Sequence, residues 1–525
     1  MTATASPKDF KITYTSSNAD MGAFHKLFDE ALNEAKKKFG GAHPLYIGGK
    51  AVQTEGALLE VRSPINSEWL LGAFSLATPA HAEQALKAAK RAQTDWGGRP
   101  WQERVAILRR AAALIRDRKF SIAAVMSLEV GKSRMEAMGD AEESADLIDY
   151  YARQMEEAHG FIKTMGKLMP NENAVSILRP FGVFVCIAPF NFPMALSTGM
   201  SAAALLAGNA VVYKPAKTTP WTGISLYECY RDAGVPPGVF NYLPCEAAVG
   251  ETLWKNPLTD GVVFTGSKAV GMRIYHEFSK DWVKPVLMEL GGKNAAVVCA
   301  SADLDMAAEG VMKSAFSLQG QKCSACSRVY LDEKIADAFL ERLLEKTAAI
   351  VKGDPTQKDV YFGPVIDAKA VKRFEDASAL AAKTGGILAG GKKLSGGVFD
   401  KGNFVEPTVA EFPLDSALFR DELFLPFLSV GRVKNLDQAI AETNKAEYGL
   451  TAGIFSKEKT EIERFFAQVE AGVCYANRKT GATTGAWPGV QPFCGWKGSG
   501  STGKGGCGPY YVAQFMREQS RTIME

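Results

Sequence analysis

Histidine is scarce in this sequence, and the few copies present do not predict a metal site. His25, His43, His81, His159 and His276 are scattered along 525 residues, and no two stand at the spacing of zinc ligands. We therefore expect no zinc site and no other bound metal.

Long apolar segments and dense runs of positive charge are missing as well. The most apolar stretch, residues 200–213, is broken by Asn209 and is shorter than the roughly 20 residues that a membrane span needs. The formal net charge is only +3. We therefore expect neither nucleic acid nor a membrane surface as a partner.

Signals for export are also absent. The first residues, MTATASPKDFKITYTSS, have neither the apolar segment of a secretory signal nor the Arg-rich pattern of an organelle transit peptide, which predicts a cytoplasmic protein. The nine cysteines are irregularly spaced and odd in number, which favours reduced thiols over a disulfide framework. With 46% hydrophobic and 23% charged residues, the chain has a globular composition, and its length predicts two or three domains in one body.

Hydrophobic periodicity separates a helical first part from an alternating remainder. We expect a charged, helical lead-in up to about residue 45. Residues 79–155 repeat apolar side chains three and four apart, which is typical of amphipathic helices. Residues 161–177 alternate around Pro170 and Asn171 and predict a β-hairpin.

Segments rich in β-branched residues follow and alternate with helical patterns. VFVCIAP, NAVVYKPA, GVVFTG and KPVLMEL are bounded by Gly, Pro or Asn, the pattern of a parallel sheet covered by helices. A second alternating region extends from about residue 294 to 474. The predicted fold class is α/β.

Cys323, in the segment QGQKCSAC at 319–326, is a candidate nucleophile. Gly320 would leave room for a substrate near the thiol, and Lys322 with local backbone amides would lower the thiol pKa. Two other interpretations stay open. Cys323 is either an inert buried thiol or, with Cys326, half of a Cys-x-x-Cys redox or zinc pair, although no second pair and no thioredoxin-like context are present.

Three further segments place polar groups at the ends of predicted strands. Glu289 ends KPVLMEL, where active sites of open α/β sheets lie, or is a solvated strand end. Asn191 stands between two prolines after VFVCI and suits an oxyanion hole or a turn. Gly266 and Ser267 join a strand to a helix whose N-terminal amides can bind pyrophosphate, although the usual G-x-G-x-x-G is missing.

Together and in this order, these four segments resemble the aldehyde dehydrogenase superfamily. The interval from Glu289 to Cys323 is the one that this family shows, and the strings PPGVFNYLP, ELFLP and YGLTAGIFS are also family-like. The likeness extends from about Pro44 to Thr522. It implies an aldehyde dehydrogenase-like α/β fold with a Rossmann-type cofactor domain, an α/β catalytic domain and a small β-flap for oligomerisation.

The resemblance also implies domain boundaries. The dinucleotide-binding domain would comprise residues 1–160 and 178–290, the catalytic domain 291–476, the substrate anchor loop 477–499, and the oligomerisation flap and tail 161–177 and 500–525. A homo-oligomer, a dimer or larger, is therefore expected.

Residue roles follow from the same resemblance. Cys323 is the nucleophile, Asn191 and the Cys323 backbone amide hold the oxyanion, and Glu289 is the general base that activates water. The cofactor is implied to be NAD, with NADP possible, and its expected contacts are Pro189, Phe190, Lys214, Lys217, Gly266, Ser267, Leu290, Glu422 and Phe424.

The substrate region most resembles the branch that oxidises L-glutamate γ-semialdehyde, the 1-pyrroline-5-carboxylate dehydrogenases of proline catabolism. In that branch the positions of Ser324, Gly485 and Ala486 bind the α-carboxylate, and those of Phe192 and Phe493 enclose the aliphatic chain. The implied reaction is NAD(P)-dependent oxidation of this aldehyde to L-glutamate through a thiohemiacetal and a thioester.

Four departures leave alternatives open. Residues 481–483 look like an insertion, Cys494-Gly495 replaces Gly-Gly, and Leu425 replaces Gly. These changes leave open another semialdehyde or an aromatic aldehyde, whose site Trp487 would line. Lys217 replaces the acid that binds the adenosine ribose hydroxyls in NAD-preferring members, which leaves NADP open.

Two alternatives concern the activity itself. A non-catalytic relative is possible because fold does not determine function, but intact Cys323, Glu289 and Asn191 argue against it. Acyl transfer to coenzyme A in place of water is opposed by Glu289, since that acid serves hydrolysis.

Overall fold

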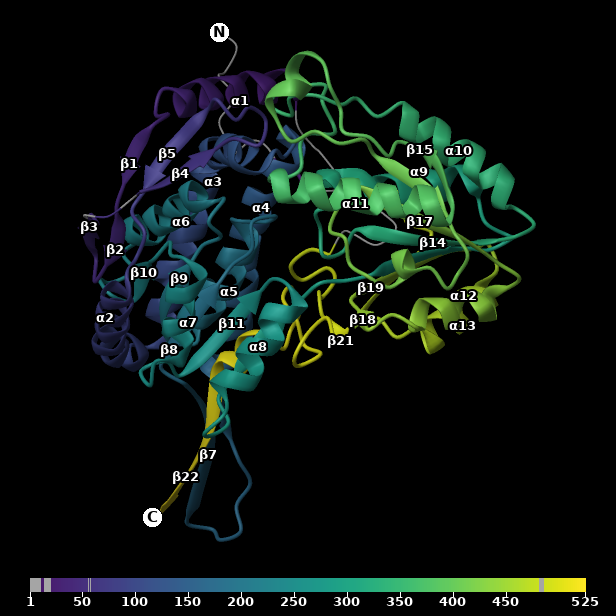
Figure 1. Ribbon diagram of the computed structural model, residues 1–525. Coiled ribbons are helices and arrows are strands. Elements are labelled where there is room, and N and C mark those ends of the chain that lie inside the picture. Colours follow the sequence, from purple (N-terminus) through teal and green to yellow (C-terminus); the bar gives the residue numbers. More distant parts are fainter. Residues whose placement is uncertain (1–10, 14–19, 55, 57, 481–485) are drawn as a thin grey trace.

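The computed structural model describes residues 11–13, 20–54, 56, 58–480 and 486–525. Within them, two seven-stranded sheets form the body of the protein (Figure 1). The first sheet has the strand order β12 (Val286–Glu289), β11 (Gly261–Thr265), β8 (Val183–Ile187), β9 (Ala210–Lys214), β10 (Phe240–Tyr242), β2 (Leu45–Ile47) and β3 (Lys50–Val52). The second has the order β15 (Gly386–Ala389), β16 (Thr408–Glu411), β17 (Phe427–Val433), β14 (Cys326–Asp332), β13 (Asn294–Val298), β19 (Thr451–Phe455) and β20 (Val473–Ala476).

The first sheet is apolar on both faces because helices cover both. Along β8, Phe184 and Cys186 face one core while Val183 and Val185 face the other, as the period of two in a strand requires. The core of Phe184 includes α1 (Met21–Lys36), α3 (Trp101–Val130), α4 (Arg134–Glu157), α5 (Ala195–Leu206) and α6 (Pro220–Ala233). The core of Val183 includes α2 (Pro79–Gly98), α7 (Ala247–Lys255) and α8 (Lys268–Phe278).

Parallel pairing brings the carboxyl ends of four strands to one edge of this sheet. Ile187 at the end of β8 lies opposite Lys214 of β9 and Phe264 of β11, and Thr265 lies opposite Glu289 of β12. Ligands of open α/β sheets bind at such edges. The β-branched segments of the sequence therefore place Lys214 and Glu289 on the same side of the molecule.

The second sheet has the same two-sided arrangement. Ala296 and Val298 of β13 pack with α9 (Leu304–Phe316) and α10 (Ala336–Ala348), whereas Ala295 and Val297 pack with α11 (Ala368–Thr384), α12 (Leu436–Asn444) and α13 (Lys459–Gln468). The α/β organisation expected from the alternating segments is present in both halves of the chain.

Three smaller sheets complete the fold within the described residues. The first joins β1 (Gly41–His43), β5 (Leu70–Phe74) and β4 (Leu59–Arg62), and the second joins β18 (Tyr448–Gly449) to β21 (Trp496–Lys497). The third joins β22 (Met516–Met524), β7 (Glu172–Pro180) and β6 (Ile162–Thr164) and projects from the body in Figure 1.

The expected bounds differ from the structure at both ends of the chain. Of the helical lead-in, α1 covers Met21–Lys36, β1 and β2 occupy its last residues, and residues 1–10 and 14–19 lie outside the described part. The predicted hairpin is present, but β7 continues to Pro180. Of the expected tail 500–525, β22 alone pairs with the hairpin. The residues before it belong to the body of the protein, since Tyr511 and Phe515 are buried in the core beside α4 and α5.

No helix in the described part of the chain has the length and apolar character needed to cross a membrane.

Candidate active site

Cys323 follows a strained turn between α9 and β14. Leu318, Gln319 and Gly320 have φ angles of 48°, 55° and 67°, three successive residues in the left-handed region that glycine alone adopts at low cost. A Cβ on Gly320 would lie 2.2 Å from the carbonyl oxygen of Leu425. The glycine therefore permits this close packing, and not the substrate approach that the sequence predicted for it.

A carboxylate on α4 holds the turn. Glu136 accepts a hydrogen bond from the Leu318 amide at 3.2 Å and forms an ion pair with Lys322 at 3.0 Å. Lys322 also donates to the hydroxyl of Ser317 at 2.8 Å. Because Glu136 contacts the first residue of the left-handed segment and Lys322 just after it, it fixes the backbone that enters Cys323.

The Cys323 thiol is protonated at neutral pH. Burial raises its pKa to about 12, and the charges of Glu289 and Glu422 act in the same direction. The expectation that Lys322 lowers this pKa is wrong, since its ammonium is paired with Glu136. Formation of a thiolate at this position would therefore require removal of the thiol proton.

Cys326 does not form a site with Cys323. Its side chain is buried, and its thiol donates to the backbone oxygen of Arg328 at 3.2 Å. Among the described residues, no group of three or more His, Cys, Asp or Glu side chains could hold a metal ion. Cys326 is thus the buried first residue of β14, and the Cys-x-x-Cys spacing forms neither a redox pair nor a zinc site here.

Glu289 is a second buried ionisable group in this region. It ends β12 and accepts a hydrogen bond from the Gly495 amide, while its Oε2 atom has no hydrogen-bond partner among the described residues. Burial raises the pKa of Glu289 well above its usual value, and the bond from Gly495 offsets only part of that shift. A buried carboxyl with one unpartnered oxygen and a raised pKa, at the end of a parallel strand, is suited to exchanging a proton.

One cavity brings these groups together with most of the expected substrate contacts. Its lining includes Cys323, Glu289, Phe192, Ser324, Ala486 and Phe493. Helix α4 adds Glu143, Leu147 and Tyr151, which are spaced four apart and share one face. Sequence analysis missed these three, because acidic residues in an amphipathic pattern usually indicate a solvated face and no local pattern indicates that α4 is buried.

Asn191 and Phe192 lie in the turn that follows β8. Asn191 is only 2% exposed and is not part of the cavity lining, whereas Phe192 is. The Lys132 ammonium lies 3.8 Å from the centre of the Phe192 ring and donates to Asp140 at 2.8 Å. Asp140 in turn accepts from the Ala195 amide at the start of α5 at 2.6 Å, so α4 also fixes this wall of the cavity.

The anchor loop is only partly described. Gly485 and the suspected insertion at 481–483 lie outside the described residues. Trp487 does not line the cavity, contrary to the aromatic-aldehyde interpretation, and its indole N–H donates to Asp146 at 2.9 Å. Although Cys494 replaces the first glycine of the usual Gly-Gly pair, Gly495 is retained, and its backbone amide donates to Glu289.

These features agree with comparisons to known proteins. Residues 51–520 match the Aldehyde dehydrogenase family. The chain belongs to this family. A 1-pyrroline-5-carboxylate dehydrogenase of Geobacillus sp. (strain WCH70) is 37% identical over 510 residues, which are 96% of this chain and 96% of that protein.

Solved structures of the family superpose closely. A 1-pyrroline-5-carboxylate dehydrogenase from Thermus with bound NAD matches with a TM-score of 0.93 and 35% identity over the whole of both chains. An NADP-dependent enzyme of E. coli matches with a TM-score of 0.86 and 31% identity over 93% of this chain and 99% of that one. The family resemblance and the fold class inferred from the motifs are confirmed.

The residues expected to bind the cofactor form two groups. Lys214, Lys217, Gly266 and Ser267 follow the ends of β9 and β11. Ser267 precedes α8 as its N-cap, but its hydroxyl accepts no capping hydrogen bond, so the first-turn amides are not capped by that side chain. These amides fit a pyrophosphate, which binds well at a helix N-terminus.

The second group lies between the two sheets. Glu422 accepts from the Gly292 amide at 2.9 Å, and the Phe190 and Phe424 rings meet edge to face at 5.9 Å. Leu290 donates its amide to the Ser499 carbonyl at 2.8 Å, and Pro189 precedes Phe190 in the turn after β8.

Sequence analysis missed the partner of Lys217. Its ammonium forms an ion pair with Glu246, the residue that precedes α7. An acid is therefore present beside Lys217, although it comes from another segment of the chain.

The high pKa of Cys323 predicts a steep alkylation profile. In a Cys326→Ser chain, the rate of Cys323 alkylation by iodoacetamide should rise roughly tenfold per pH unit between about pH 7 and 10, because the thiolate fraction grows in that proportion below the pKa. Peptide mass spectrometry measures the rate. A plateau beginning below about pH 9 would mean that the thiolate is stabilised, as the sequence first suggested.

Proposed function

We propose that this protein oxidises L-glutamate γ-semialdehyde to L-glutamate with NAD as the hydride acceptor. The observation that carries the proposal is the shared cavity of the Cys323 thiol, the Glu289 carboxyl, Ser324 and Ala486. Relatives of matching length that are named 1-pyrroline-5-carboxylate dehydrogenase support the choice of substrate.

The first step forms a bond between Cys323 and the aldehyde carbon. The thiol loses its proton to solvent or to a neighbouring base, and Sγ adds to the carbonyl to give a thiohemiacetal. Negative charge then develops on the former carbonyl oxygen. We assign the side-chain amide of Asn191 and the backbone N–H of Cys323 as donors to that oxygen, since donors fixed in advance stabilise it best.

Hydrolysis completes the cycle. The nicotinamide, when bound, accepts the hydride from the substrate carbon. The carbon that has lost hydride remains attached to Sγ as a thioester. Glu289, once ionised, takes a proton from water, the resulting hydroxide adds to the thioester carbon, and the C–S bond breaks with return of a proton to Cys323. The raised pKa of Glu289 makes its carboxylate a stronger base than an exposed glutamate.

Charged groups around the cavity match the substrate's α-amino acid end. We assign Ser324 with the amides of Gly485 and Ala486 to its carboxylate, and the rings of Phe192 and Phe493 to its aliphatic chain. Glu143, which lines the same cavity, supplies a carboxylate for its ammonium group. An uncharged or aromatic aldehyde has no carboxylate or ammonium group for these residues to bind, so it would forgo the hydrogen bonds to charged groups that the semialdehyde can form.

The residues that we assign to the cofactor favour NAD over NADP more than Lys217 alone suggested. We assign Lys214 to the adenosine ribose, Ser267 and Gly266 to the pyrophosphate, and Glu422 with Phe424 to the nicotinamide riboside. Pro189, Phe190 and Leu290 border that end. Glu246 beside Lys217 restores an acid to the region, and its charge opposes the 2′-phosphate of NADP.

We further propose that the first sheet is the dinucleotide-binding domain and the second the catalytic domain. The sheet of β6, β7 and β22 exposes Ile162 and Ile523, and the connection between β6 and β7 exposes Met165 and Leu168; together they offer an apolar surface that fits a second copy of this chain. A homo-oligomer built through this sheet is therefore expected.

Substrate recognition is tested by Ser324→Ala. Hydrogen bonds to a charged group contribute roughly 1.5–3 kcal/mol each, so kcat/KM for L-glutamate γ-semialdehyde should fall about tenfold or more. Activity on pentanal, which has no α-carboxylate, should change little. Steady-state NADH formation measures both. A wild-type enzyme that prefers pentanal or benzaldehyde would contradict the proposed substrate while leaving the family assignment intact.

Cofactor choice is tested by Glu246→Gln. Release of Lys217 should raise kcat/KM for NADP relative to NAD by about fivefold or more, since a cation near a phosphate gains on the order of 1 kcal/mol or more even with solvent screening. The double variant Glu246→Gln/Lys217→Met is the matched control and should lose the gain. An unchanged ratio in both chains would mean that neither side chain reaches the ribose.

A further inference from the structure

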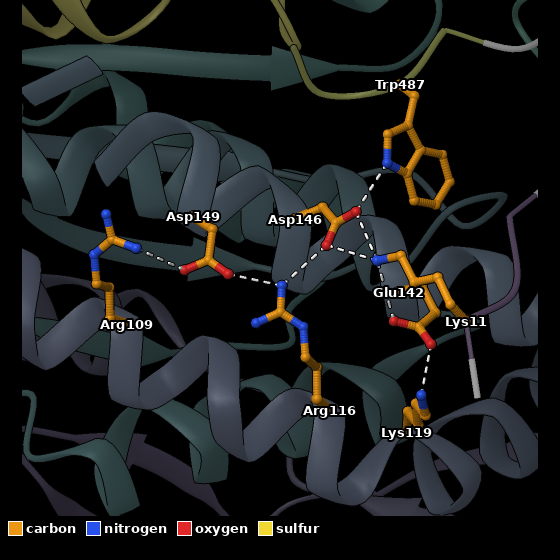
Figure 2. Close-up of polar contacts among 8 residues, drawn as sticks. All are labelled: Lys11, Arg109, Arg116, Lys119, Glu142, Asp146, Asp149 and Trp487. Atoms are coloured by element: carbon orange, nitrogen blue, oxygen red, sulfur yellow. Dashed lines mark hydrogen bonds and ion pairs between the residues drawn. The ribbon is translucent and has the colours of Figure 1, made fainter. Parts of the chain in front are cut away.

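A charged cluster joins the N-terminal segment, α3, α4 and the anchor loop around Asp146 (Figure 2). The Lys11 ammonium donates to both carboxylate oxygens of Asp146, at 2.8 and 2.7 Å. Arg116 of α3 donates to Oδ1 at 2.9 Å, and the Trp487 indole N–H donates to Oδ2 at 2.9 Å. We call Lys11, Arg116, Asp146 and Trp487 the Asp146 cluster.

Further charges fix the members of this cluster. Lys11 lies 3.5 Å from Glu142, whose second oxygen accepts from the buried Lys119 at 2.6 Å. Arg116 also forms an ion pair with Asp149 at 2.7 Å. Burial alone would raise the pKa of Asp146, but the bonds from Lys11, Arg116 and Trp487 hold it below its usual value. The carboxylate is therefore ionised and occupied by three donors.

Helix α4 connects the cluster to the cavity. Glu143, Leu147 and Tyr151 face the cavity, while Glu142 and Asp146, each one position earlier, face the cluster. Because one helix carries both sets of residues, a loop that is held by Asp146 is also held in a fixed position relative to the cavity wall.

Trp487 connects the cluster to the substrate loop. It directly follows Ala486, which lines the cavity. The Trp487 carbonyl accepts hydrogen bonds from the backbone amides of Val490 and Gln491 at 3.0 and 3.1 Å. The Gly489 amide donates to the backbone carbonyl of Cys507 at 3.1 Å. The turn after Ala486 is thus rigid within itself, and the bond to Asp146 ties its first residue to α4.

The N-terminal segment is anchored as well. Ile12 is fully buried in the same core as Phe24 and Phe28 of α1. The Lys11 ammonium also lies 5.7 Å from the centre of the Trp487 ring, within the range of a cation–π contact. Lys11 therefore contacts both partners of the Asp146–Trp487 hydrogen bond.

We infer that Lys11 and Asp146 are positioning residues for substrate specificity: they hold Trp487 and thereby set the Ala486 amide against the cavity. The inference rests on the proposed function for the identity of the aldehyde. The N-terminal segment, more than a hundred residues from the catalytic motifs in sequence, thus completes the pocket for aldehydes that carry an α-carboxylate. Uncharged aldehydes do not need the Ala486 amide and are insensitive to the cluster.

The test compares Lys11→Met and Trp487→Phe with wild type on L-glutamate γ-semialdehyde and pentanal. Trp487→Phe keeps the ring and removes the N–H donor. Each change should raise KM for the semialdehyde roughly tenfold, because a charge-assisted hydrogen bond no longer places the loop, while kcat and both constants for pentanal stay within about twofold. Arg118→Met, which removes a cation from α3 whose partner is Asp232 and not a member of the network around Asp146, should match wild type.

A double variant separates positioning from general destabilisation. If Lys11 acts through Trp487, Lys11→Met added to Trp487→Phe should raise KM little further. Asp146→Asn keeps an oxygen acceptor for the indole and should retain more semialdehyde affinity than Asp146→Ala. Equal losses on both aldehydes, additive effects of the two changes, or no effect of either would overturn the inference.

The outcome stays interpretable if the proposed substrate is wrong. A wild-type enzyme without preference for the semialdehyde over pentanal would refute the proposed function by itself. Hydrogen exchange of the peptide spanning residues 486–491 then tests the cluster directly. Lys11→Met should reduce the protection of this peptide, and unchanged protection would refute the positioning role.

Discussion

Glu136 on α4 binds the backbone amide of Leu318, the first residue of the left-handed turn, and the ammonium of Lys322 after it, and the placement of Cys323 depends on these two contacts. Three successive residues with positive φ do not hold such a turn unaided, since each non-glycine member costs on the order of 1 kcal/mol or more. Removal of one partner from a buried ion pair typically costs about 3–5 kcal/mol, because the other charge is left buried without compensation. Loss of either Glu136 or Lys322 would therefore disturb the turn, and the same pairing leaves the Lys322 ammonium compensated beside the Cys323 thiol.

The same helix organises the rest of the cavity. Asp140 fixes the start of α5 and, through Lys132, the Phe192 ring, while Asp146 holds Trp487 after Ala486. Helix α4 thus carries a series of carboxylates whose partners come from the start of α5, the turn before β14, the N-terminal segment and the C-terminal loop. Burial in the cavity that this helix helps to form raises the pKa of both Cys323 and Glu289. A thiol is also less prone to oxidation than a thiolate.

Local sequence patterns predicted the parts that depend on neighbouring residues. The β-branched segments identified β8, β9, β11 and β12, because strands covered on both faces must be apolar throughout. The ends of those strands then identified Glu289 and the Gly266 region. The motifs around Cys323 identified the family, and the structure places Phe192, Ser324, Ala486 and Phe493 in one cavity.

Contacts between segments that are distant in the chain could not be predicted from local sequence patterns. The partners of Lys322 and Trp487 lie on α4, and the partner of Lys217 precedes α7. Without these partners, Lys322 was expected to lower the pKa of Cys323 and Trp487 to line an aromatic-aldehyde site, and both expectations are wrong. Gly320 was assigned to substrate approach because its close neighbour, Leu425, is far away in the chain. Residues 507–515 were assigned to the tail because their burial depends on α4 and α5.

The central claim is that Cys323 carries the acyl group of glutamate and that Glu289 removes it. The most direct measurement is intact-protein and peptide mass spectrometry of Glu289→Gln after mixing with NAD and L-glutamate γ-semialdehyde. We expect a single turnover of NADH and a mass gain of one γ-glutamyl group, which persists in Glu289→Gln/Cys326→Ser and is lost in Glu289→Gln/Cys323→Ser. A mass gain that depends on Cys326, or a full turnover rate with no adduct in Glu289→Gln, would contradict the account.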